Sequence, residues 1–282
     1  MNLVRRSSQR ALDFLRDPSL AGDGRRPSAR LREYVSRAEV ARSRASTLEE
    51  LVASCPWYHT IDLPRGVVTP GSYDHRELVR QIGLDDDLTG KRALDVATFD
   101  GFWAFELERR GAEVVALDVP SVADLDLPGS ASDIVRREGL DLPLGTAFDI
   151  AHRALGSSVE RVERSVYDLA PDDLGSFDLV HVGDLLLHLR HPLQALQRIR
   201  SVTAGQLVLT DCFEPSLSAL PEPAILYRGG WQDLHWWLPS LEALAQMVVD
   251  AGFEHCEVRN VVRLPPRRGG DPMWRAVIHA RP

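Results

Sequence analysis

Two acidic residues at the ends of apolar segments carry the clearest chemistry in this sequence of 282 residues. Residues 92–96 form an apolar run that predicts a buried strand around Asp95, and residues 113–117 predict a second strand, followed by Asp118. A turn closed by Gly101 and an amphipathic helix separate the two strands. Strand, turn, helix, strand and acid form the first half of a nucleotide-binding βαβ unit. In such a unit the N–H groups of the turn approach the ligand and the second acid accepts ribose hydroxyls.

The turn, Asp95-Val-Ala-Thr-Phe-Asp-Gly101, holds one glycine and lacks the G-x-G-x-x-G spacing of a dinucleotide site. It resembles motif I of class I S-adenosylmethionine (SAM) methyltransferases. The resemblance implies that SAM is the cofactor, that Asp95 faces the methionine ammonium and that Asp118 holds the ribose diol. The other turn residues that it places against the donor are Ala97, Thr98, Phe99 and Gly101.

Ala97 departs from this family, which usually has glycine at that position. We expect Ala97 to keep a negative φ, because the left-handed region strongly favours glycine. The alternative for the whole segment is a buried βαβ crossover without a ligand. Two strand-end acids at this spacing, together with the turn glycine, are more than packing requires and favour a binding site.

Strands and helices alternate along the rest of the chain and predict a Rossmann-like, doubly wound α/β fold. Further strands are expected at 159–166, 177–183, 206–210, 253–262 and 274–280, and helices at 73–82, 146–155, 192–202 and 241–251. The result is a mostly parallel seven-stranded sheet with a helical N-terminal extension. The expected parts are a flexible Arg-rich arm (1–27), a helical extension and lid (28–87), and a SAM-binding domain (88–282) with a substrate-side insertion (211–240).

Later segments sharpen the resemblance, which covers residues 70–280. Gly183-Asp-Leu-Leu-Leu-His-Leu-Arg-His-Pro192 follows the fourth strand, and Trp236-Trp-Leu-Pro-Ser240 precedes the last helix, which ends at Ala251-Gly-Phe253. These segments are similar to those of the tRNA wobble-uridine carboxymethyltransferase-like group.

Two departures from that group concern the transferred chemical group. Its carboxy-SAM-using members carry a Tyr before the exit histidine, where this chain has Leu187. Their N-terminal lysine, which pairs with the extra carboxylate, has no counterpart here, because Lys91 belongs to the first strand. A buried carboxylate without a cation is costly, so ordinary SAM is the expected donor and methyl the expected cargo.

Other strand ends supply the remaining donor contacts. Ligands of doubly wound sheets bind beyond the carboxyl ends of the strands, which is where Asp168 and Asp184 fall. The resemblance implies that Asp168 contacts the adenine amino group; a helix N-cap or a loop acid is the alternative. Tyr167 and Gly183 are the adjoining donor-site residues, and Asp184 either contacts the donor or orients a histidine.

His188, shortly after the fourth strand, is the candidate general base. An imidazole accepts a proton near neutral pH, and this position lies near the expected methyl group. If His188 is structural instead, His59 or His235 would be the base. His188 and His191 are spaced i, i+3, but Pro192 and the lack of a nearby carboxylate cluster disfavour a metal pair, and no metal is expected.

Two aromatic segments outside the expected core should form the acceptor pocket. Trp57 and Tyr58 lie in a proline-punctuated stretch that could fold over the donor as a lid, and the insertion holds Trp231, Trp236 and Trp237. Tryptophan at this density suits an aromatic or sugar-bearing ligand. The alternative is that Trp236 and Trp237 pack the insertion onto the sheet.

Composition restricts the class of protein. A net charge of −8 disfavours a nucleic-acid partner, since phosphate backbones usually require a basic face. No apolar run is long enough to span a membrane, and the N-terminus lacks an export signal. The three separated cysteines indicate free thiols. We therefore expect a cytoplasmic protein with a small-molecule acceptor and no membrane partner; a homodimer is compatible with these features.

Three functions remain open. The first is methyl transfer to a hydroxyl of a small molecule, such as a natural product or a glycoside. The second is methylation of a tRNA base, which the branch resemblance implies. The third is a non-catalytic SAM-binding interaction protein, which Ala97 makes conceivable. An arginine cluster near the strand ends would favour tRNA, whereas a closed tryptophan-lined cavity would favour a small acceptor.

Overall fold

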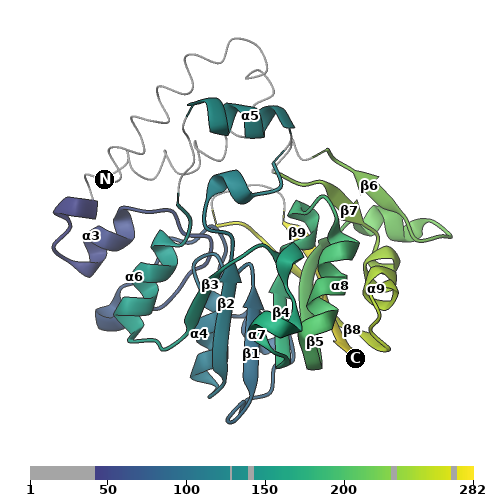
Figure 1. The fold of residues 1–282 in the computed structure, drawn as a ribbon, viewed down its shortest axis with the longest axis horizontal. Coiled ribbons are helices and arrows are strands. Elements are labelled where there is room, and N and C mark those ends of the chain that lie inside the picture. Colours follow the sequence, from purple (N-terminus) through teal and green to yellow (C-terminus); the bar gives the residue numbers. More distant parts are fainter. Residues whose placement is uncertain (1–41, 128, 139–142, 230–233, 268–271) are drawn as a thin grey trace.

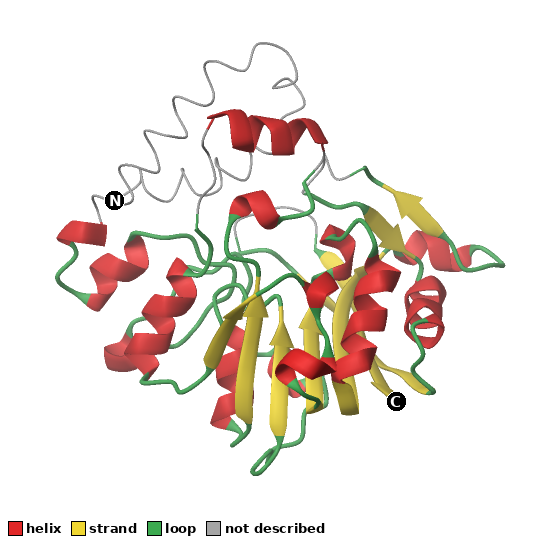
Figure 2. Ribbon diagram, in the orientation of Figure 1, coloured by secondary structure: helices red, strands yellow, loops and turns green. Residues whose placement is uncertain are grey.

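A computed structural model describes residues 42–127, 129–138, 143–229, 234–267 and 272–282 (Figures 1 and 2). The Arg-rich arm, the first part of the helical extension and Trp231 lie outside these ranges. Within the described ranges, no helix has the length and apolar character needed to cross a bilayer.

A seven-stranded sheet in the order β3-β2-β1-β4-β5-β9-β8 forms the centre of the molecule. Its strands are β1 (Arg92–Val96), β2 (Glu113–Asp118), β3 (Glu160–Glu163), β4 (Phe177–Gly183), β5 (Thr203–Phe213), β8 (His255–Leu264) and β9 (Met273–Arg281). The pairs among β1 to β5 are parallel, whereas β9 runs antiparallel to β5 and β8. This topology confirms the expected doubly wound, mostly parallel sheet.

Helices cover both faces of the sheet (Figure 1). The helices are α3 (Leu48–Ala53), α4 (Phe102–Arg109), α5 (Gly129–Glu138), α6 (Thr146–Leu155), α7 (Pro171–Leu174), α8 (Pro192–Val202) and α9 (Leu241–Asp250), of which α5 lies apart from both faces. Buried side chains of α4 and α6 join those of residues 52–88 in one hydrophobic cluster, and α8 and α9 contribute to a second cluster. The described part of the N-terminal extension is therefore packed into the core beside the sheet.

Side-chain alternation explains why β1 is buried on both faces. Ala93 belongs to the first cluster and Leu94 to the second, so neighbouring residues fill opposite layers. Gly101 then precedes α4 with φ 88°, a left-handed conformation that favours glycine. A Cβ at Gly101 would lie 2.4 Å from the Phe105 ring, so the turn can approach the helix this closely because it has no side chain.

The structure differs from the expected elements in four places. Strand β3 is shorter than expected, and the helix expected at 73–82 is a single 3₁₀ turn, Leu78–Arg80. Helix α5, beyond the carboxyl ends of the parallel strands in Figure 1, and a hairpin of β6 (Ile225–Tyr227) and β7 (Trp237–Pro239) were not expected. The sequence of α5 is mostly polar, and three-residue strands are too short to show a period.

Substituting Gly101 by alanine should destabilise the protein more than the same change at Gly90. Both glycines have positive φ, 88° and 75°, but a Cβ at Gly90 would meet nothing within 4 Å. Gly90→Ala should lower the free energy of unfolding by about 1–2 kcal/mol through backbone strain alone. Gly101→Ala should lower it by a further ~1–3 kcal/mol through overpacking against Phe105. Urea unfolding of both variants measures the difference, and equal losses would contradict the close approach.

Candidate functional site

The carboxyl ends of the parallel strands meet at one edge of the sheet, and acids lie at or near several of them. Asp95 is in β1, Asp118 ends β2 and Asp184 follows β4, as the sequence places them. A fourth acid, Asp211, lies near the end of β5 and was not singled out from the sequence. Asp168 ends a 3₁₀ turn after β3, and its side chain is exposed at this edge.

Asp95 is buried, with one carboxylate oxygen left over. Asp95 is 2% exposed, and its Oδ1 lies 2.8 Å from Nδ1 of His181, with which it pairs in β4. Its Oδ2 and the Thr98 hydroxyl are buried without a hydrogen-bond partner among the described residues. A buried anion with an unused oxygen suits a cation, and the ammonium of a SAM methionine group would supply one. The residues present therefore fit the donor that the sequence predicts.

The turn that follows β1, residues 97–101, has a strained backbone; we call it the donor turn. Ala97 has φ 61° and Phe99 has φ 52°, both in the left-handed region. The expectation that Ala97 keeps a negative φ is therefore wrong. The N–H groups of Ala97 and Thr98 both bond to the Leu117 carbonyl, at 2.8 and 3.1 Å, which fixes the turn against β2. Strain of this kind persists where the surroundings over-determine a conformation, and it clusters at ligand-binding sites.

Asp118 holds the same turn from the end of β2. Its Oδ2 accepts the N–H of Phe99 and its Oδ1 accepts that of Val119, both at 2.8 Å. Burial raises the pKa of Asp118 to about 6, although these two hydrogen bonds act to lower it. Each carboxylate oxygen keeps a second lone pair, so the geometry allows the ribose contact, which stays a prediction.

A buried aspartate that the sequence analysis did not single out joins the N-terminal extension to this turn. Asp100 Oδ2 accepts the backbone N–H groups of Tyr58 and His59 at 2.9 and 2.8 Å, and its Oδ1 lies 2.5 Å from His59 Nδ1. We call residues 57–73 the strap; its two ends pair, with the Tyr73 N–H bonded to the Tyr58 carbonyl. The strap therefore lies against the turn after β1; that it acts as a lid over the donor stays a prediction.

Two strap residues with expected roles at the site are buried and bonded within the protein. Trp57 is 4% exposed and donates its indole N–H to the Val52 carbonyl at 2.9 Å, so it packs in the core, which gives the predicted substrate contact no support. His59 is 6% exposed, bonded to Asp100, and stacked on Phe102 with ring centroids 5.2 Å apart. A histidine held and covered in this way is poorly placed to act as the general base.

Asp184 is engaged by the protein itself. Arg275, in β9, places Nε and Nη2 each 2.8 Å from a carboxylate oxygen, and Tyr58 donates its hydroxyl at 2.7 Å. Burial alone would raise the pKa of Asp184, but the Arg275 charge and hydrogen bonds hold it below its usual range. Both oxygens are used, which argues against the predicted donor contact. Tyr58, expected to line the acceptor pocket, directs its hydroxyl to Asp184.

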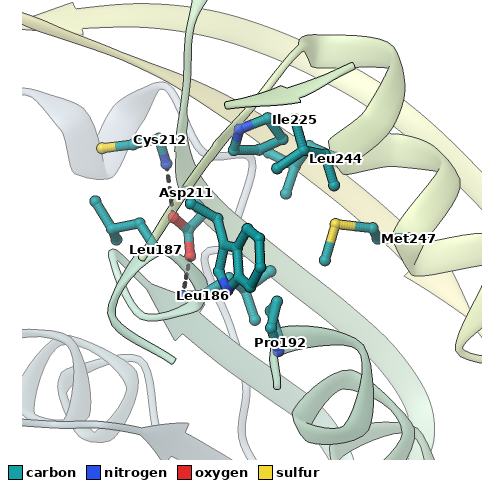
Figure 3. A pocket seen from close by; sticks show the side chains of 10 residues that line it. Leu186, Leu187, Pro192, Asp211, Cys212, Ile225, Leu244 and Met247 are labelled. Atoms are coloured by element: carbon teal, nitrogen blue, oxygen red, sulfur yellow. Dashed lines mark hydrogen bonds between the residues drawn. The ribbon is translucent and has the colours of Figure 1, made fainter. Parts of the chain in front are cut away.

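Asp211 holds the turn that follows β4. It is 1% exposed, and its carboxylate accepts the N–H groups of Leu185, Leu186 and Cys212 at 3.0, 2.7 and 2.7 Å. Burial, reinforced by the nearby Asp184 charge, raises the pKa of Asp211 to about 7. Figure 3 shows this carboxylate among largely apolar side chains that line a small pocket between the turn, the hairpin and α9.

The turn continues into the 3₁₀ segment η6 (Leu186–His188), which carries the candidate base. The rings of His188 and His235 have centroids 5.2 Å apart, and His188 Nδ1 lies 3.1 Å from the Leu234 carbonyl oxygen. Two histidines predicted as alternatives thus lie side by side. His191 stands apart at the N-cap of α8, where its N–H donates to the Tyr167 hydroxyl.

The tryptophans of the insertion pack against the same region. Trp236 donates its indole N–H to the Asp126 carbonyl at 2.7 Å, with the Arg190 guanidinium 4.9 Å from its ring centroid. Trp237 donates to the Leu189 carbonyl at 3.0 Å. Both indole N–H groups are used within the fold, as the packing alternative expects, so an acceptor would meet ring faces. Gly183 ends β4 at the same edge of the sheet.

Comparisons with known proteins agree with the fold. Residues 72–258 match the family model described as a methyltransferase domain. Magnesium-protoporphyrin O-methyltransferase of Rhodobacter capsulatus is 30% identical over 161 residues, which are 56% of this chain and 55% of that protein. This chain therefore spans about half the length of that relative.

Solved structures show the same fold. The N-terminal domain of EvdMO1, solved in the presence of SAH and D-fucose, matches with a TM-score of 0.56 and 20% identity over 87% of this chain and 96% of that one. The same domain with SAH bound gives the same values. These matches do not single out the tRNA-modifying branch. The chain belongs to the methyltransferase domain family of class I SAM-dependent methyltransferases, and its cofactor is SAM.

Proposed function

We propose that this protein transfers the methyl group of SAM to a hydroxyl of a small-molecule acceptor, and that His188 removes the hydroxyl proton. The observation that carries the proposal is the contact between His188, in the turn after β4, and His235, just before β7, at the edge of the sheet where we expect the donor.

SAM, when bound, supplies an electrophilic methyl group on a sulfonium. Around it, Asp95 would hold the ammonium, Asp118 the ribose and Asp168 the adenine. The role of Asp95 has the most direct support, because its buried Oδ2 lacks a partner among the described residues. The roles of Asp118 and Asp168 rest on their positions at the strand ends.

The hydrogen bond of His188 assigns its tautomer. A carbonyl oxygen can only accept, so the contact between His188 Nδ1 and the Leu234 carbonyl requires a proton on Nδ1. In the neutral ring Nε2 is then the unprotonated nitrogen and can take a proton from an attacking hydroxyl. The Leu234 carbonyl also stabilises the imidazolium that this transfer forms.

The surroundings of the histidine pair support a ring-bearing acceptor. The partly exposed rings of Trp236 and Trp237 offer faces on which an aromatic group or a sugar could stack. The name of the Rhodobacter capsulatus relative specifies O-methylation, and D-fucose was present with one of the structural neighbours. Both are compatible with a hydroxyl acceptor, and the net charge of −8 gives less support to tRNA.

Removing the imidazole should impair turnover without impairing donor binding. His188→Ala should lower kcat about 10²-fold or more, because general base catalysis typically contributes that much, while the affinity for SAH stays nearly unchanged. The assay measures methyl transfer to hydroxyl acceptors from an aromatic and glycoside panel, and calorimetry measures SAH binding. His191→Ala, three residues away at the N-cap of α8, is the matched control. Near-normal turnover by His188→Ala would show that His188 is structural.

Replacing Asp211 by asparagine should change how stability depends on pH. The carboxyl titrates at about 7 in the folded protein and near 3.9 when unfolded, so folding takes up a proton between these values. The stabilisation from this proton is fully present below about pH 4 and is lost as the pH rises through about 7. Relative to wild type, Asp211→Asn should therefore gain stability as the pH rises from about 4 to about 7. Thermal melts of both proteins test this, and parallel Tm curves would refute it.

A further inference from the structure

Arg275 is a buried cation that the donor and acceptor sites described above do not use. It lies in β9 and is 1% exposed. Its Nε and Nη2 bond to Asp184, and its guanidinium carbon lies 5.0 Å from the Tyr73 ring centroid of the strap. Arg275 therefore contacts both the exit of β4 and the strap from the opposite side of β5.

A buried ion pair of this kind is weak evidence for stability. Removing two charges from water costs about as much as their attraction returns, so such pairs often serve to fix one arrangement of the chain. The backbone here is consistent with that function. Asp184 has φ 47°, in the left-handed region, and its N–H bonds to the Thr210 carbonyl at 2.9 Å. Positive φ is uncommon for residues other than glycine, although aspartate adopts it more often than most, and here it coincides with the ion pair.

Tyr58 connects this pair to the donor turn. Its backbone N–H is 2.9 Å from Asp100 Oδ2, beside the turn after β1, and its hydroxyl is 2.7 Å from Asp184 Oδ2, after β4. The hydroxyl also lies 3.5 Å from Arg275 Nη2. One residue of the strap thus spans the two loops that face the donor.

We propose that Arg275 is a positioning residue that, through Asp184 and Tyr58, docks the strap across the carboxyl ends of β1 and β4 and thereby assembles the donor site. The inference rests on the donor site described above and is independent of His188 acting as the base. Because SAM or SAH would bind the docked form better, ligand binding and strap docking must favour each other by the same factor.

Tyr58→Phe tests this link by removing one hydroxyl while keeping the ring. We expect SAH to bind about five- to tenfold more weakly, the size of one typical intramolecular hydrogen bond. Hydrogen exchange of the peptide covering 57–73 should be faster in the variant without ligand, and saturating SAH should restore its protection. Tyr227→Phe, which removes a hydroxyl from a side chain that is 62% exposed, is the matched control and should match wild type in both measurements.

A double-mutant cycle tests the pathway through Asp184. Tyr58→Phe and Asp184→Asn should be non-additive in SAH affinity, because both break the same hydrogen bond. Arg275→Lys should retain more SAH affinity than Arg275→Gln because it keeps the positive charge, although lysine cannot make the two parallel N–H bonds of a guanidinium. If the Arg275 variants do not fold, Tyr58→Phe alone decides.

Two results would overturn the inference. One is a Tyr58→Phe variant with wild-type SAH affinity and wild-type exchange of the strap. The other is a lower Tm with unchanged SAH affinity, which would make the network merely structural. SAH affinity and hydrogen exchange do not require methyl transfer, so both can be interpreted even if His188 is not the general base.

Discussion

The conformations of the loops at the carboxyl edge of the sheet depend on which hydrogen-bond donors satisfy the buried carboxylates there. A carboxylate removed from water is costly unless it is bonded or paired, so each one fixes the segment that satisfies it. Asp118 fixes the donor turn, Asp100 the strap, Asp211 the turn before His188, and Asp184 the side chain of Arg275. Asp95 differs in keeping one buried oxygen without a partner among the described residues, and this is the atom that suits the donor.

The same loops carry backbone strain. Ala97, Phe99 and Asp184 all have positive φ, and each lies just beyond a strand end at the donor edge. Each is also held by hydrogen bonds from a neighbouring strand or loop, so the carboxylate network and the strained backbone support one another. A site that is formed before the ligand arrives loses less conformational entropy on binding.

Apolar patterns were enough to predict the sheet and the helices that cover it, because strands such as β1 and β4 and helices such as α6 and α8 are regular elements. The strand-end acids were also predictable, since parallel topology places such residues at one edge. The pairing of Arg275 with Asp184 was not, because the two residues lie 91 positions apart and meet only where β9 lies beside β5. The positive φ of Ala97 was missed because residue preference is a local rule, whereas bonds from β2 decide the conformation of this turn.

A crystal structure with bound SAH would test the central claim most directly. The account predicts that the ribose hydroxyls bond to Asp118, that the amino group lies beside Asp95 Oδ2, and that the sulfur faces the pair of His188 and His235. A ligand that leaves Asp95 and Asp118 untouched, or whose sulfur points away from both histidines, would contradict it.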